Sequence, residues 1–85
     1  MKLRFKHYPE TDIELERWET PMYPHPTAKK PDFIKLAVLK IDDDCYEAWR
    51  IGTLWRFFQS CLGWAKTLKE AKGICKRYLE AEGVR

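Results

Sequence analysis

A Gly-Thr pair (residues 52–53) separates two runs rich in aromatic residues. Glycine followed by one further residue suits a two-residue type II′ turn, so the sequence predicts a β-hairpin that folds at this pair. In that register Arg50 lies opposite Trp55 and Trp49 lies opposite Arg56, so that each guanidinium can stack on an indole. The pattern therefore predicts antiparallel strands in this half of the chain.

The same stretch has a helical alternative. Asp44 can cap a helix that runs to Leu62 and ends at Gly63. On a helical projection the apolar residues spread around the whole circumference, so no buried face emerges. Gly52 would also lie in the helix interior, where glycine is unfavourable. The pattern favours strands over residues 44–62.

Alternating charged and apolar residues predict another hairpin over residues 2–18. With a loop over residues 8–12, Lys6 pairs with Glu14, and opposite charges share one face of the hairpin while apolar side chains share the other. The alternative is a capping box that begins at Thr11 and opens a short helix. The apolar residues that follow do not share a helical face, so the hairpin is favoured.

The middle of the chain has the pattern of a loop, a strand and a turn. Residues 20–31 hold four of the five prolines, which predicts an extended, polyproline-like loop rather than a strand. Residues 33–41 are apolar on both faces apart from two lysines, as is typical of a central strand. Residues 42–44 are three aspartates. Aspartate is a preferred turn residue, so a solvated turn is favoured over a Mg²⁺ site.

The C-terminal region predicts a helix. Thr67 and Glu70 have the spacing of a capping box, and Gly83 stands where the helix is expected to end. Gly73, inside the helix, suggests close approach to the sheet. One broad face is apolar: Leu68, Ala71, Ile74, Cys75, Tyr78, Leu79 and Ala81. The opposite side carries a lysine stripe: Lys69, Lys72 and Lys76.

Together these elements predict a single α+β domain over residues 1–85. We expect a small antiparallel sheet of four to five strands with one C-terminal helix packed on one face. The chain is 45% hydrophobic, enough to bury a core without a metal or a disulfide. The predicted core is Leu3, Phe5, Leu36, Val38, Ile51, Leu54, Leu68, Ala71, Ile74, Cys75 and Tyr78.

Several classes of chemistry find no support in the residues. Cys45, Cys61 and Cys75 are too widely spaced for zinc, and no secretory signal precedes them, so reduced thiols in a cytoplasmic protein are expected. No apolar run approaches the roughly 20 residues that cross a bilayer. Phosphate-loop, dinucleotide and hydrolase motifs are missing as well. We therefore expect no cofactor, no metal, no membrane and no enzymatic activity.

The aromatic content points to binding instead. Four Trp, four Tyr and four Phe are more than one helix can cover, and exposed aromatic residues with arginine are typical of binding hot spots. We therefore expect a non-enzymatic module that occupies the surface of a partner protein. The alternative role for each Trp is in the core, with arginine stems lying over it. The predicted contacts are Trp49, Arg50, Trp55, Arg56 and Tyr23.

Residues 46–82 resemble the sheet-plus-helix module by which phage-type integrases bind arm DNA. The shared points are strands rich in Trp and Arg, then residues 63–67 (Gly-Trp-Ala-Lys-Thr) entering a helix with Glu70 and Ala71. The resemblance implies strand side chains in a major groove and makes nucleic-acid binding the alternative function. In size and style the chain also resembles phage and prophage accessory proteins, including inhibitors of host defence. Possible nucleic-acid contacts are Lys35, Lys40, Lys69, Lys72 and Lys76.

Overall fold

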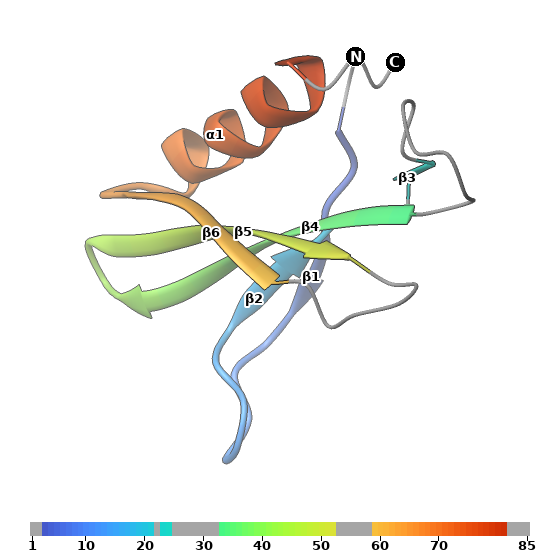
Figure 1. The fold of residues 1–85 in the computed structure, drawn as a ribbon. Helices are drawn as coiled ribbons and strands as arrows, with labels where there is room; N and C mark the ends of the chain where they lie inside the picture. The colour runs from blue at the N-terminus through green and yellow to red at the C-terminus, as the bar shows by residue number, and fades with distance from the viewer. Residues whose placement is uncertain (1–2, 22, 25–32, 53–58, 82–85) are drawn as a thin grey trace.

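A computed structural model describes residues 3–21, 23–24, 33–52 and 59–81, which form an antiparallel sheet with a helix on one face (Figure 1). The predicted α+β class is confirmed. The strands are β1 (Lys6–Tyr8), β2 (Arg17–Glu19), β3 (Tyr23–Pro24), β4 (Phe33–Asp42), β5 (Cys45–Gly52) and β6 (Gln59–Ala65), and the helix is α1 (Leu68–Ala81). Five strands lie in the order β1-β2-β4-β5-β6, and the short β3 pairs with β4.

Strand β4 lies in the middle of the sheet, as its apolar sequence predicts. It pairs with β5 along one side and with β2 and β3 along the other. Its alternate residues Ile34, Leu36 and Val38 are fully buried on the face that α1 covers. The aspartate turn is also confirmed, with the Asp43 N–H donating to Asp42 Oδ1 over 2.8 Å.

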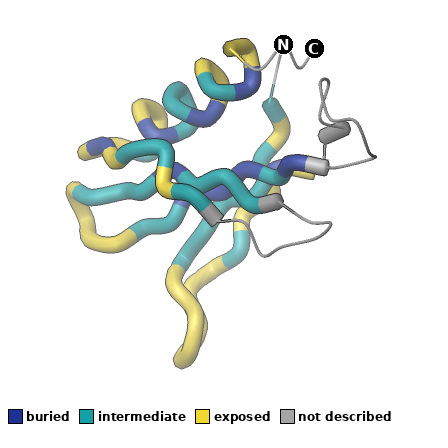
Figure 2. Tube along the Cα trace, viewed as in Figure 1, coloured by how far each residue is buried: buried dark blue, intermediate teal, exposed yellow. Residues whose placement is uncertain are grey.

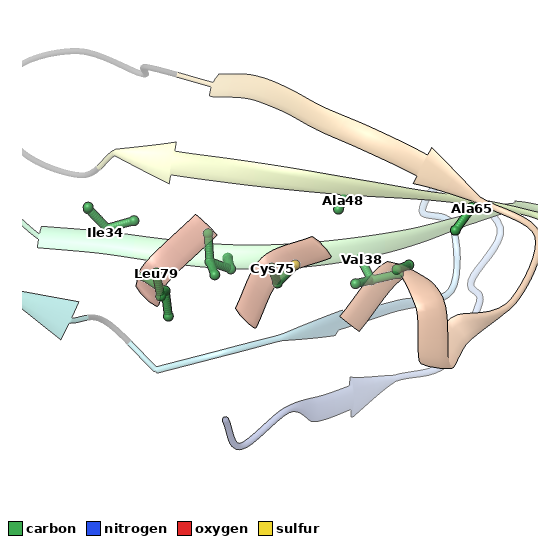
Figure 3. Packing of buried hydrophobic residues seen from close by; sticks show 8 residues of the cluster. Ile34, Val38, Ala48, Ala65, Cys75 and Leu79 are labelled. Carbon is green, nitrogen blue, oxygen red and sulfur yellow. The ribbon is translucent and has the colours of Figure 1, made fainter. Parts of the chain in front are cut away.

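Helix α1 begins where the capping box predicts. The Glu70 N–H donates to Thr67 Oγ1 over 3.2 Å, which satisfies one of the free amides of the first turn. Ala71, Cys75 and Leu79 follow one another at four-residue spacing and are fully buried against the sheet. Figure 3 shows Cys75 and Leu79 among the buried side chains of the core. They face β4, β5 and β6 and form the main contact between helix and sheet.

The core agrees in large part with the prediction. Leu36, Val38, Ala71 and Cys75 are buried. Five further predicted residues pack half-buried against them: Leu3, Phe5, Leu68, Ile74 and Tyr78. The prediction of Ile51 is wrong, because Ile51 pairs with Lys35 on the face away from α1, and Leu54 lies outside the described residues. The predicted core left out five buried hydrophobic residues: Ile34, Ala37, Ala48, Ala65 and Leu79.

The first predicted hairpin forms, but its register differs. Strands β1 and β2 pair Lys6 with Glu19, so the pairing of Lys6 with Glu14 is wrong. The connection is longer than expected because Thr11 organises it: its N–H donates to the Glu14 carbonyl over 2.9 Å, and its Oγ1 accepts the Glu14 N–H over 3.0 Å. These bonds close a turn and not the first turn of a helix.

The second hairpin also forms with a different register. Strands cover residues 45–52 and 59–65, so the helical alternative is wrong for these residues. Ile51 pairs with Gln59, which puts residues 53–58 in the connection and rules out a two-residue turn at Gly52. Arg50 pairs with Ser60 and Trp49 with Cys61, so the predicted Trp–Arg pairs are wrong. Trp55 and Arg56 themselves lie outside the described residues.

The proline-rich segment supplies a strand where a loop was expected. Tyr23 pairs with Ile34, and Pro24 with Phe33. The pairing places β3 beside β4, on the same side of that strand as β2. Proline is tolerated here because the strand is two residues long and lies at the rim of the sheet. Residues 22 and 25–31 of the predicted loop lie outside the described residues.

Thr20 bridges the break between β2 and β3. Its N–H donates to the Leu36 carbonyl over 2.9 Å, and its Oγ1 accepts the Leu36 N–H over 2.9 Å. We expect Thr20→Val to lower the free energy of unfolding by about 1–3 kcal/mol, because it leaves the buried Leu36 N–H without its acceptor. Thr20→Ser keeps the acceptor and should retain most of the stability in a urea denaturation series. Equal losses for both variants would contradict this role of the hydroxyl.

Two glycines should respond to alanine in opposite directions. Gly63 has a φ of +153°, a conformation that residues with a side chain rarely adopt. We expect Gly63→Ala to lower the free energy of unfolding by about 1–3 kcal/mol.

Gly73 lies within α1, where an added Cβ would meet only the flexible end of Arg77 at 3.4 Å, so the expected close approach to the sheet is wrong. Gly73→Ala should raise the free energy of unfolding by about 0.5–1 kcal/mol, measured by urea denaturation. A loss at Gly73 or a gain at Gly63 would contradict the described backbone.

Candidate functional site

Helix α1 covers one face of the sheet, and the opposite face has no element of the described chain lying across it (Figures 1 and 2). We call this opposite face the uncovered face. On β4 its members alternate with the buried residues Ile34, Leu36 and Val38. On the other strands they are identified by pairing, because cross-strand partners share a face. They are Lys6, Tyr8, Arg17, Glu19, Lys35, Ala37, Leu39, Glu47, Trp49, Ile51, Cys61 and Trp64.

The part of this face on β4, β5 and β6 is mainly apolar. Its apolar side chains, which we call the apolar half, are Ala37, Leu39, Trp49, Ile51 and Trp64. Trp64 has 67% of its surface exposed. Trp49, which lies opposite Ala37, is half-buried, and its indole Nε1 is buried without a hydrogen-bond partner among the described residues. Large aromatic area therefore remains on the side of the sheet that the helix does not cover.

The part of the face on β1, β2 and the start of β4 is ionic. Lys35 Nζ lies 2.7 Å from Glu19 Oε1, and Arg17 Nε lies 2.5 Å from Glu19 Oε2, so two cations share one carboxylate. Burial works to raise the pKa of Glu19, but the hydrogen bonds from Lys35 and Arg17 outweigh it and hold the pKa below its ordinary value. Arg17 also lies over the Tyr8 ring, 4.4 Å from its centroid. Glu19 is therefore a carboxylate held in place by two cationic side chains, Arg17 and Lys35.

A hollow of about 400 Å³ borders this ionic part. We call it the basic hollow, because Arg4, Lys6 and Lys35 line it and Glu19 is the single carboxylate among its described lining residues. Tyr8, Phe5, Thr20 and Pro21 complete the lining. Towards the other end of β4 a smaller hollow of about 230 Å³ is acidic, lined by Glu10, Glu16, Asp42 and Asp43 around Lys40. Charge is therefore separated along the sheet.

The predicted contact residues do not form one cluster. Trp49 lies on the uncovered face, whereas Arg50 pairs with Leu36 and belongs to the face that α1 covers. Adjacent residues of a strand point to opposite faces, so no sheet can present both side chains together. Tyr23 is in β3, and its side chain is not described. Tyr8, Leu39 and Trp64 on the uncovered face were not predicted. These three residues could not be assigned to one face from the sequence, because the assignment requires the strand register.

The lysines proposed as nucleic-acid contacts are dispersed. Lys35 is on the uncovered face and bonded to Glu19, while Lys40 lies 3.8 Å from Glu16 and 3.6 Å from Asp43. Lys72 is over the Phe5 ring at 5.1 Å, on the helix layer. Lys69 and Lys76 are exposed on the same helix. The structure does not bring these five side chains onto one surface.

Catalytic and metal chemistry have few candidate groups. The three cysteines are free, and within the described segments no three His, Cys, Asp or Glu side chains converge on a common point. His7 stacks on Trp18 at 4.9 Å, and its Nε2 lies 2.7 Å from Glu16 Oε2, which fixes the β1–β2 connection.

At 14 residues, α1 is too short and too polar to cross a membrane, and the described part of the chain has no other helix.

The thiols should differ sharply in reactivity. Cys61 is exposed, whereas Cys75 is fully buried, and burial raises the pKa of Cys75 from 9.0 to about 12. At a given pH below 9 the thiolate fraction of Cys75 is therefore about a thousandfold smaller than that of an unshifted thiol. We expect maleimide to modify Cys61 rapidly and Cys75 only after unfolding, with mass spectrometry locating each adduct. Comparable rates in the folded protein would contradict the packing of α1.

The chain has no match among protein-family models, curated proteins or solved structures. The function must therefore be inferred from the residues of the chain itself.

Proposed function

We propose that this protein is a non-catalytic module that occupies the surface of a partner protein through the uncovered face of its sheet. One observation carries the proposal: α1 covers a single face, and on the opposite face Trp64 is 67% exposed while Leu39, Trp49 and Ile51 are half-buried. Aromatic side chains of this kind dominate the energetics of protein interfaces, because they bury large areas at little cost in side-chain entropy.

The layout of the face supports a protein partner. An apolar centre bordered by charged side chains is the usual anatomy of a protein–protein interface. Here Glu19 and Lys35 border the apolar half on one side, and Glu47 lies within it, between Leu39 and Trp64. The bordering charges would set register and exclude wrong partners, while the apolar centre supplies most of the affinity. Occupation of a partner's surface requires no turnover, which suits an accessory or inhibitory role of the kind found among small phage proteins.

The test is capture of a partner by matched variants. Leu39→Ser/Trp64→Ser changes the apolar half, and Lys69→Ser/Lys76→Ser changes the exposed side of α1. We expect the first variant to lose a partner that the wild-type protein captures from lysate, and the second to keep it. Loss with the helix variant and retention with the sheet variant would overturn the proposal and favour an electrostatic role for the lysine stripe.

A further inference from the structure

We propose that the basic hollow receives acidic side chains of the partner segment that docks on the uncovered face. This inference rests on the proposed function and adds the chemistry of the partner to it. The ligand class is a short peptide segment rich in aspartate or glutamate. The hollow lies next to the apolar half, since Lys35 pairs with Ile51 and Glu19 pairs with Ala37 across the strands. One segment can therefore place carboxylates in the hollow and apolar side chains on the sheet.

The hollow has two cationic side chains, Lys6 and Arg4, that are not paired with a carboxylate of the described residues. Lys6 lies directly opposite Glu19 in the β1–β2 ladder, yet both Glu19 oxygens are already taken by Lys35 and Arg17. Across the described residues, Lys6 and Arg4 form no ion pair, and both side chains are exposed. The hollow therefore has two exposed cations at its rim that can pair with an incoming anion.

Neighbouring contacts hold several of the cations near the hollow in place. Lys6 Nζ lies 5.2 Å from the centroid of the Tyr8 ring, which Arg17 also contacts. Glu19 fixes Arg17 and Lys35 in place, so the positive potential at the wall of the hollow is held by a network and not by loose side chains alone. A carboxylate that enters meets this potential without a large rearrangement of the wall.

Charge at the other end of the sheet favours a short peptide over duplex DNA. Glu10, Glu16, Asp42 and Asp43 surround the acidic hollow towards the far end of β4. A phosphate backbone that ran along the sheet from the basic hollow would meet these carboxylates and be repelled. A peptide segment avoids them, because its acidic residues can end where its apolar residues begin.

A titration with a defined probe tests the hollow alone. The probe is a hexaglutamate peptide, followed by the NMR shifts of backbone amides at an ionic strength of about 50 mM, where screening is weak. Arg4→Ala/Lys6→Ala removes two charges at the hollow, and Lys69→Ala/Lys76→Ala removes two charges on α1. We expect shifts centred on Tyr8, Thr20 and Lys35. Peptide affinity should fall about fivefold in the first variant and change less than about twofold in the second.

Other results overturn the inference. Equal losses in both variants would mean general attraction of an anion to a basic protein. Tighter binding of a random-sequence duplex than of the peptide, with a steep salt dependence, would assign the cations to nucleic acid instead. The outcome is separable from that of the proposed function: if Leu39→Ser/Trp64→Ser abolishes capture while the peptide fails to bind, the docking face stands and the acidic-segment inference falls.

Discussion

Leu36→Ala is expected to lower the free energy of unfolding by about 2–5 kcal/mol, a large share of the stability of a domain this size. Leu36 is fully buried in β4, within the cluster that includes Ala71, Cys75 and Leu79 of α1. Truncation removes apolar contacts and leaves a cavity between two layers that cannot close completely. Urea denaturation followed by far-UV circular dichroism measures the loss.

Leu39→Ala is the matched control on the same strand. Leu39 is half-buried on the uncovered face, where water already reaches part of the side chain. Its truncation should cost about 1 kcal/mol, because only partial burial is lost. Similar losses at the two positions would contradict one-sided burial, since they would require the uncovered face to be packed as tightly as the face beneath α1.

Trp64→Ala should have the largest effect on partner binding. Truncation of an aromatic hot spot typically costs 2 kcal/mol or more, so we expect the affinity for the captured partner to fall about 30-fold or more. The stability of the free protein should change little, because most of the side chain is exposed. Biolayer interferometry with the purified partner measures the affinity, and thermal unfolding of the variant checks its fold.

Ile13→Ala is the control for this variant. Ile13 is 90% exposed in the β1–β2 connection and is not part of the sheet. Its truncation should leave the affinity unchanged. If it weakens binding as much as Trp64→Ala does, the interface extends over the connection and the apolar half is not its centre.

Apart from β3, which formed where a loop was expected, the elements of the fold could be predicted from local patterns, whereas the strand registers could not. Apolar continuity identified β4, and the Thr67–Glu70 spacing identified the start of α1. Register depends on how a connection closes. In the first hairpin, the bonds that Thr11 makes to Glu14 lengthen the loop, and in the second, the pairing of Ile51 with Gln59 excludes a two-residue turn at Gly52. Alternation alone leaves both choices open, because several registers put charges on one face.

The candidate site depended on those registers and was therefore predicted only in part. Trp49 was predicted as a contact residue and lies half-buried on the uncovered face, whereas Arg50 was assigned to the same surface although strand periodicity separates the two. Trp64 was placed at the entry to the helix, whereas it lies in β6 opposite Glu47. A register shift between Ala48 and Trp49 sets that position, and Gly63 has positive φ beside it. A bulge of this kind re-aims the residues that follow it, which no local pattern in the sequence reveals.

Site-specific photo-crosslinking tests the docking face most directly. A photoreactive amino acid at Leu39 places the crosslinker on the uncovered face, and one at Lys76 places it on the exposed side of α1. With the captured partner present, irradiation should give a covalent adduct from position 39 and none from position 76. An adduct from position 76 alone would contradict the account, because it would place the partner on the helix and leave the uncovered face without a role in binding.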